Sequence, residues 1–140
     1  MVKQDEMKGA VKLTALIDEL GLSVLNKGAD FETALVGIKD VNRSGLQLVG
    51  FFDYFDERRL QVVGMAETKM LESMTSEQRA ESFARLFSYN IPALVVSRDL
   101  DVYPECLAMA RKHQKTLLHT ADTTVVFTTR VIEYLSQAMA

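Results

Sequence analysis

The sequence has few of the residues that several classes of protein need. It contains no tryptophan, two prolines and a single cysteine, Cys106, among its 140 residues. One cysteine cannot form a disulfide within the chain, and the lack of a disulfide framework fits a reducing cytoplasm. The longest apolar runs are far shorter than the roughly 20 residues that a transmembrane helix needs, so we expect no membrane contact.

An excess of basic residues is also absent. The chain carries 16 Lys and Arg against 19 Asp and Glu, a net charge of -3, and no basic face stands out. Because nucleic-acid-binding proteins neutralise phosphates with such a face, we expect no nucleic-acid partner. The hydrophobic fraction of 48% over 140 residues predicts one globular domain, with a flexible tail at 1–10 and the domain at 11–140.

The first half of the chain shows one clear helix and several short strands. The apolar residues of 13–20 repeat with helical spacing, and Gly21 predicts the end of that helix. The aromatic-rich residues 51–55 predict a loop packed onto the core. The remaining predicted elements are strands over 22–25, 34–38 and 60–63, a short helix within 44–49, and a helix over 67–74.

The second half alternates strands and helices, which is typical of α/β wiring. Strands are predicted over 93–96 and 116–119, and the helix between them begins at Pro104. A last helix follows, capped by Asp122 or Thr123. We therefore predict an α/β fold in which a small, mostly parallel sheet carries helices on both faces.

Two helices of this half show patterns that predict their ends and their core faces. Thr75 and Gln78 have the spacing of a capping box, so a helix is expected from residue 76. Its predicted core stripe is Ala80, Phe83, Ala84 and Phe87. The predicted core stripe of the last helix is Val125, Thr129, Ile132 and Met139, with Val131 and Leu135 beside it.

No catalytic constellation is evident in the sequence. Gly45-x-x-x-x-Gly50 matches the first half of a phosphate-binding P-loop, but Phe51-Phe52 follows instead of the required Lys and hydroxyl residue. His113 and His119 are not spaced like a pair of zinc ligands. We expect no catalytic residue and no metal site.

The strongest candidate for a ligand site is Asn42-Arg43-Ser44-Gly45. A loop of this composition after a strand can present a guanidinium group and backbone N–H groups to an anion. Thr123 is a further candidate, because a helix N-terminus favours negative charge. The structural alternative is that Arg43 pairs with Asp40 or Asp53 and that Thr123 only caps its helix.

The same region resembles a known family. Residues 42–55 (Asn-Arg-x-Gly-Leu-x-Leu-x-Gly-Phe-Phe-Asp-Tyr-Phe), 57–64 (Glu-Arg-Arg-Leu-Gln-Val-Val-Gly) and Glu67 are similar to the N-terminal domain of HPr kinase/phosphorylase. Residues 86–96 and Tyr134-Leu135 extend the resemblance to roughly 13–135, although Ser44 stands where the family usually has proline. The resemblance implies a fold like the N-terminal domain of the muramyl peptide ligases.

The resemblance also implies a function, and it implies that this chain carries only one part of the enzyme that performs it. The family phosphorylates and dephosphorylates a serine of the phosphocarrier HPr, with ATP or pyrophosphate and Mg²⁺, and its P-loop belongs to a C-terminal kinase domain. We therefore expect a cytoplasmic regulatory and assembly domain in carbon catabolite control that holds no cofactor. Its partners would be further copies of itself and a kinase domain. It would contact HPr only through that kinase domain. The alternatives are a stand-alone sensor of a phosphorylated sugar or nucleotide at Asn42–Gly45, and an independent small enzyme.

Overall fold

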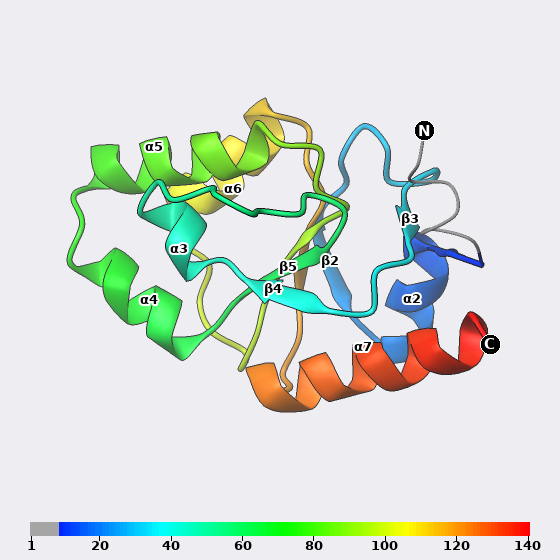
Figure 1. The fold of residues 1–140 in the computed structure, drawn as a ribbon. Coiled ribbons are helices and arrows are strands. Elements are labelled where there is room, and N and C mark those ends of the chain that lie inside the picture. Colours follow the sequence, from blue (N-terminus) through cyan, green and yellow to red (C-terminus); the bar gives the residue numbers. More distant parts are fainter. Residues whose placement is uncertain (1–8) are drawn as a thin grey trace.

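The computed structural model describes residues 9–140, which build a five-stranded sheet with helices on both faces (Figure 1). The strand order is β2-β7-β6-β5-β4. Four strands run parallel, and β2 (Ser23–Asn26) is an antiparallel edge strand. The parallel strands are β4 (Val41–Arg43), β5 (Leu60–Val63), β6 (Leu94–Val96) and β7 (Leu117–His119). The predicted α/β class is confirmed, while most of the predicted tail at 1–10 lies outside the described residues.

One face of the sheet is covered by α2 (Leu13–Leu20) and α7 (Thr124–Ala138), which Figure 1 shows to the right of the sheet and below it. Every second residue of the strands points to this side, including Val62, Val95 and Leu118, all of them fully buried. A small antiparallel pair, β1 (Val11–Lys12) and β3 (Leu35–Val36), adjoins α2. As predicted, α2 ends at Gly21, whose φ of 65° is the left-handed conformation that glycine adopts freely.

The other face carries four helices, α3 (Gly45–Leu48), α4 (Met65–Glu72), α5 (Ser76–Phe87) and α6 (Pro104–Lys112). The alternate strand residues, such as Val63, Leu94 and Leu117, pack against them. The capping box of α5 is confirmed, because Thr75 Oγ1 accepts the N–H of Gln78 and Gln78 Oε1 accepts the N–H of Thr75. Two core layers therefore sandwich one sheet.

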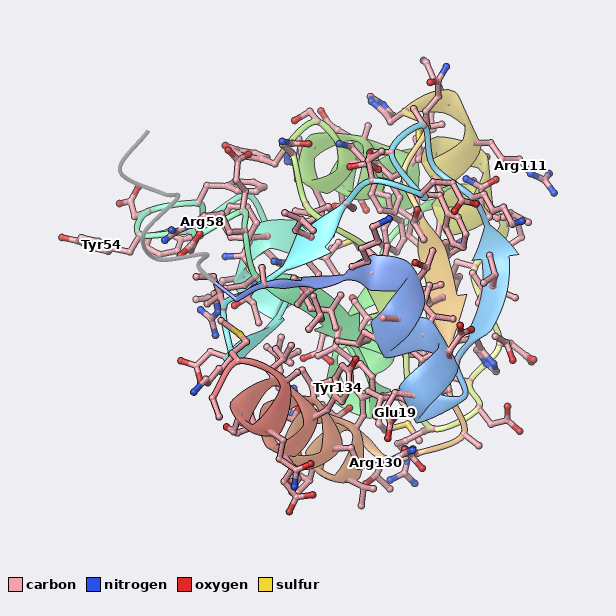
Figure 2. The ribbon with its side chains drawn as sticks, turned by 90° about the vertical axis from the view of Figure 1, so that its right-hand side faces the viewer. Glu19, Tyr54, Arg58, Arg111, Arg130 and Tyr134 are labelled. Carbon is pink, nitrogen blue, oxygen red and sulfur yellow. The ribbon has the colours of Figure 1, made fainter. Side chains whose placement is uncertain are left out.

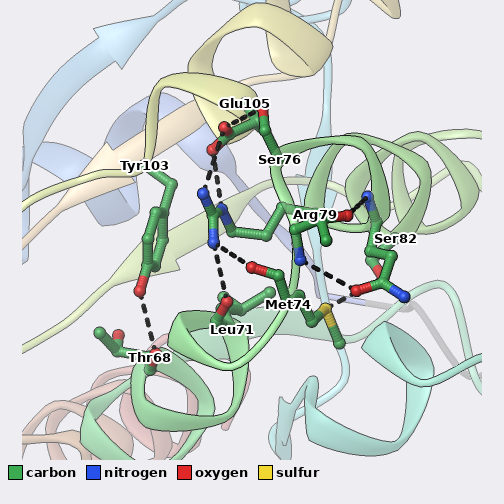
Figure 3. Close-up of polar contacts among 10 residues, drawn as sticks. Thr68, Leu71, Met74, Ser76, Arg79, Ser82, Tyr103 and Glu105 are labelled. Atoms are coloured by element: carbon green, nitrogen blue, oxygen red, sulfur yellow. Dashed lines mark hydrogen bonds and ion pairs between the residues drawn. The ribbon is translucent and has the colours of Figure 1, made fainter.

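An ion pair locks three of these helices together. Arg79 of α5 donates from Nε to Glu105 of α6 at 3.1 Å and from Nη1 to the carbonyl oxygens of Leu71 and Met74 at 3.1 and 2.7 Å (Figure 3). Ser76 donates a further hydrogen bond to Glu105 at 2.6 Å. These contacts join the ends of α4, α5 and α6 into one unit.

Two strands were not predicted from the sequence. β4 begins within Asp40–Asn42, where polar residues predicted a turn, and it forms because Val41–Arg43 pair in parallel with Leu60–Val62. Arg59 adds a hydrogen bond from Nη2 to the carbonyl oxygen of Val41 at 3.0 Å. β1 has two residues and forms only against β3. In both cases a partner distant in sequence decides the conformation.

The predicted core stripe of α7 is wrong, although Val131 and Leu135, which were predicted beside it, are buried. Val125 is 72% exposed, and the buried residues are Thr124, Phe127, Val131 and Leu135. α7 is apolar on more than one side, so its spacing alone left the buried side open. The contact of Thr124 with Gly64 and Ser97 fixes the rotation of the helix about its axis.

Three smaller predictions also need correction. In α5, Ser82 and Leu86 are buried with Phe83 and Phe87, whereas Ala80 and Ala84 are only half-buried. The helix predicted over 67–74 begins two residues earlier. The aromatic loop packs only in part: Phe52 stacks on Tyr89, with ring centroids 4.5 Å apart, but Tyr54 is fully exposed and points away from the body (Figure 2).

Within residues 9–140, no helix combines the length and the apolar character needed to cross a bilayer.

Candidate functional site

The predicted ligand loop begins with a buried network of amide side chains. Asn42 donates both protons of Nδ2, one to Gln61 Oε1 at 2.7 Å and one to Gln47 Oε1 at 2.8 Å. Gln61 is completely buried and donates in turn to the carbonyl oxygen of Arg59 at 2.9 Å, while Gln47 donates to that of Phe51 at 3.2 Å. Because every one of these bonds is internal, Asn42 holds α3 against β5 and is committed to the fold.

Ser44 belongs to the same network. Its side chain is fully buried and donates to Gln61 Oε1 at 2.9 Å. Its backbone N–H donates to the carbonyl oxygen of Val62 at 3.0 Å, which extends the ladder between β4 and β5. The proline that the resemblance implies at this position has neither donor, so serine gives this chain two hydrogen bonds there.

Arg43 is the member of the loop that reaches solvent. Its side chain is 50% exposed, and Nη2 lies 3.4 Å from Oε1 of Glu67. Glu67 is buried, and the same oxygen accepts the N–H of Gly64 at 2.7 Å at the start of α4. The predicted ion pair with Asp40 or Asp53 is therefore wrong, since Glu67 is the acidic partner of Arg43.

A chain of close contacts links this loop to the start of α7. A Cβ atom added at Gly45 would lie 3.6 Å from Oε2 of Glu67, in ordinary contact. One added at Gly64 would overlap Oγ1 of Thr124, and that oxygen lies 2.7 Å from Oγ of Ser97. All of these residues lie at or just beyond the carboxyl ends of the parallel strands, where α/β proteins place their ligand sites.

Thr123 also lies beyond the carboxyl end of a parallel strand, β7, but does not touch the loop. Its Oγ1 accepts the N–H of Val126 at 3.2 Å, so it caps α7 as predicted, and Asp122 instead pairs with Arg130 at 2.6 Å. Within residues 9–140, no hydrogen bond or ion pair joins Thr123 to Asn42–Gly45. Arg43 therefore remains the residue of this set most available to an anion.

Three residues that build this region, Gln47, Gln61 and Gly64, were not predicted as site residues. Gln61 lies opposite Asn42 in the register of β4 and β5, a pairing that only the folded sheet brings about. The Gly64-x-x-Glu67 spacing was a usable signal, because an acidic residue three positions after a helix cap accepts the cap N–H.

Cys106 is the single cysteine of the chain, and its surroundings decide its reactivity. Cys106 is buried on α6, and this burial, with a smaller contribution from Glu105, raises the pKa of its thiol well above its usual value. A thiol held in its neutral form is a poor nucleophile. In the part of the chain that the structure describes, no three His, Cys, Asp or Glu side chains are grouped so as to hold a metal ion.

Sequence comparisons with known proteins point to one family. The profile of the HPr serine kinase N-terminus family matches residues 11–135. The HPr kinase/phosphorylase of Alkaliphilus metalliredigens is 36% identical over 131 residues, which cover 94% of this chain and 42% of that protein. The HPr kinase/phosphorylase of Caldanaerobacter subterraneus is 38% identical over 130 residues, with 93% and 42% covered.

A solved structure shows a similar fold. It contains the CBS and DRTGG domains of the regulatory region of Clostridium perfringens pyrophosphatase, and it matches with a TM-score of 0.66 at 16% identity. The match covers 99% of this chain and 54% of that one. The chain spans less than half the length of the curated relatives it matches. With 125 of its 140 residues inside the family profile, the chain belongs to the HPr serine kinase N-terminus family.

Proposed function

We propose that this chain is the regulatory and assembly domain of an HPr serine kinase/phosphorylase and does not transfer phosphoryl groups by itself. The observation that carries the proposal is the family match over residues 11–135, set against a coverage of only 42% of the relatives' length. No Gly-x-x-x-x-Gly-Lys segment followed by Ser or Thr occurs in the 140 residues. A P-loop needs that Lys for the phosphates and that hydroxyl for Mg²⁺.

The proposal assigns regulation and assembly to this chain and phosphoryl transfer to the part of the longer relatives that lies outside the match. ATP, pyrophosphate and Mg²⁺ would be handled by the part of the relatives that lies outside the match, and this chain would hold no cofactor. The chain would act in the cytoplasm, in carbon catabolite control, and would associate with further copies of itself. Contact with HPr would be made only through a kinase domain.

The test of this division is a phosphoryl-transfer assay on the purified chain. The chain is incubated with HPr, ATP and Mg²⁺, and separately with serine-phosphorylated HPr and inorganic phosphate. The full-length Caldanaerobacter subterraneus relative serves as the active control. We expect phosphoserine to appear or disappear only with the control. Turnover by the 140-residue chain would overturn the proposal and revive the independent enzyme.

A second function is sensing of a phosphorylated sugar or nucleotide at Asn42–Gly45. One observation favours it: the Arg43 guanidinium is half exposed, and its 3.4 Å contact with Glu67 is long for a charge-assisted hydrogen bond. Arg43 thus keeps donors for a phosphate group. A thermal-shift screen with sugar phosphates and nucleotides tests this function, with Arg43→Ala as the probe and Arg111→Ala, an exposed residue of α6, as the control. An unchanged shift in Arg43→Ala would exclude the site.

A further inference from the structure

The topology of the sheet places a crevice at one particular pair of strands. β6 and β7 are parallel neighbours, but the helices that follow them cover opposite faces of the sheet. Cys106 and Ala110 of α6 belong to one core layer, while Phe127 and Val131 of α7 belong to the other. In open α/β sheets, ligands bind outside the carboxyl ends of such a pair, because the two connecting loops diverge there.

A cavity of about 500 Å³, which is open to solvent and not enclosed, lies beside this point. Its apolar lining comes from three different elements: Leu25 of β2, Leu100 and Val102 of the loop between β6 and α6, and Leu107 of α6. Cavities that bury small organic molecules are mostly apolar and of about 300–1,000 Å³. The cavity borders the β2 edge of the sheet, whereas Asn42–Gly45 adjoins β4 at the opposite edge.

Two irregularities of the backbone shape the lining. β2 contains a bulge, in which Val24 pairs with Leu118 and Asn26 with Leu117, so that Leu25 is the inserted residue. Bulges of this kind re-aim a side chain, and Leu25 lines the cavity. Arg98 and Asp99 follow β6 with φ values of 59° and 55°, and their N–H groups donate to the carbonyl oxygens of Asp122 and Thr120.

The polar part of the lining contains two carboxylates and one imidazole ring. It consists of Asp99, Asp101 and His119. Nε2 of His119 lies 2.9 Å from the carbonyl oxygen of Leu100, so that nitrogen carries the proton and donates it, and Nδ1 lies 3.6 Å from Oδ1 of Asp99. Within residues 9–140, Asp101 has no ion-pair partner, and Arg98 is not among the residues that line the cavity. Asp99, which is 73% exposed, and Asp101 therefore form an acidic rim beside the apolar lining, with the His119 ring next to Asp99.

We propose that this cavity binds a small organic ammonium ion, with the ammonium group between Asp99 and Asp101 and an apolar body against Leu25, Leu100 and Leu107. The acidic rim excludes phosphates and carboxylates by like-charge repulsion. The described residues hold no group of three metal-ligating side chains, which favours an organic cation over a bare metal ion. The proposal is independent of the regulatory function proposed above, because it concerns a different edge of the sheet.

The test is a methyl NMR titration of the intact chain with three probes of equal length, hexylammonium, 1-hexanol and hexanoate. We expect hexylammonium to produce saturable shifts of the methyl signals of Leu25, Leu100, Val102 and Leu107. Its Kd should be about fivefold to tenfold lower than that of 1-hexanol, since an exposed charge pair contributes about 1 kcal/mol. Hexanoate should bind more weakly than either.

Two variants separate the carboxylates from the apolar floor. Asp99→Asn with Asp101→Asn should weaken hexylammonium binding about fivefold to tenfold, to the level of 1-hexanol, while 1-hexanol binding is unchanged. Asp18→Asn removes an exposed carboxylate on α2 and should leave both affinities as they were. The double variant keeps its two side-chain volumes, and its methyl spectrum reports whether it is folded. The proposal is overturned by equal affinity for all three probes, by no saturable shift with hexylammonium, or by unchanged affinity in the double variant.

Discussion

The hydroxyl oxygen of Thr124 lies so close to Gly64 that it would overlap a Cβ atom there. The φ of Gly64 is -129°, an ordinary extended value, so close approach and not backbone conformation requires glycine there. The Thr124 oxygen also lies 2.7 Å from Oγ of Ser97 and is buried. The start of α7 is therefore held directly against the carboxyl ends of β5 and β6.

Gly64→Ala should destabilise the protein by about 1–3 kcal/mol, because the added methyl group overpacks this contact. Adding Thr124→Ala should recover part of the loss, since the overlapping oxygen is then absent. Urea unfolding of the two single variants and the double variant gives the coupling energy, which should exceed about 0.5 kcal/mol. Gly45→Ala, where the added atom meets only ordinary contacts, is the matched control. Additive effects of Gly64→Ala and Thr124→Ala would contradict the contact.

Gln61→Leu should destabilise the protein by about 2–3 kcal/mol. The substitution keeps a buried side chain but removes the oxygen that accepts hydrogen bonds from Asn42 and Ser44, leaving buried donors unpaired. Gln137→Leu on the exposed side of α7 should change the unfolding free energy by less than about 0.5 kcal/mol. If both variants unfold at the same denaturant concentration, the amide network does not stabilise the fold.

Glu105→Gln should lower stability at pH 7 by about 1–2 kcal/mol, because Ser76 and Arg79 then bind a neutral acceptor. The hydrogen bond from Ser76 and then that from Arg79 hold the pKa of Glu105 below its usual value. A lowered carboxyl pKa stabilises the fold above the unfolded pKa of about 4.3, and this contribution is lost as the pH falls toward the folded pKa.

The difference between wild type and Glu105→Gln should therefore narrow as the pH falls from about 5 to about 3. Asp56, whose pKa is lowered chiefly by the side chain of Arg58, titrates in the same direction in both proteins and cancels in the comparison. Unfolding free energies measured across this pH range test the prediction. A difference that stays constant with pH would show that the charge of Glu105 has no part in the effect.

Cys106 should be protected from thiol reagents in the folded protein. Burial raises the pKa of its thiol, so very little thiolate is present at pH 8 and the reagent has no access to the sulfur. We expect reaction with a disulfide reagent to be at least about a hundredfold slower in the native protein than in denaturant. Rapid native-state reaction would place Cys106 at the surface.

Elements with purely local signals were predictable from the sequence. α2 begins and ends where its leucine spacing and Gly21 predict, and the capping box of Thr75 and Gln78 forms with both hydrogen bonds. In each case the residues that decide the structure lie within one or two turns of one another. β4 could not be predicted in this way, because its polar residues become a strand only by pairing with β5.

The candidate site likewise depends on contacts between residues that are distant in the sequence. The sequence identified Asn42–Gly45 as unusual, but the partners that explain Asn42 and Ser44 lie on other elements. Gln61 reaches Asn42 through sheet register, and Glu67 reaches Arg43 through the position of α4. The buried face of α7 was predicted wrongly for a related reason, since Val125 and Phe127 are both apolar and the contact at Gly64 selects the buried side.

The most direct test of the regulatory proposal joins this chain to a kinase domain. The matching N-terminal part of the Caldanaerobacter subterraneus relative, about 42% of its length, is replaced by this chain, and the rest of that relative is also prepared alone. The HPr phosphorylation rate is measured for both, and the sedimentation mass divided by the chain mass gives the number of subunits in each. We predict that the fusion contains more subunits per particle and phosphorylates HPr at a different rate from the isolated part. An identical number of subunits together with an identical rate would contradict a regulatory and assembly role.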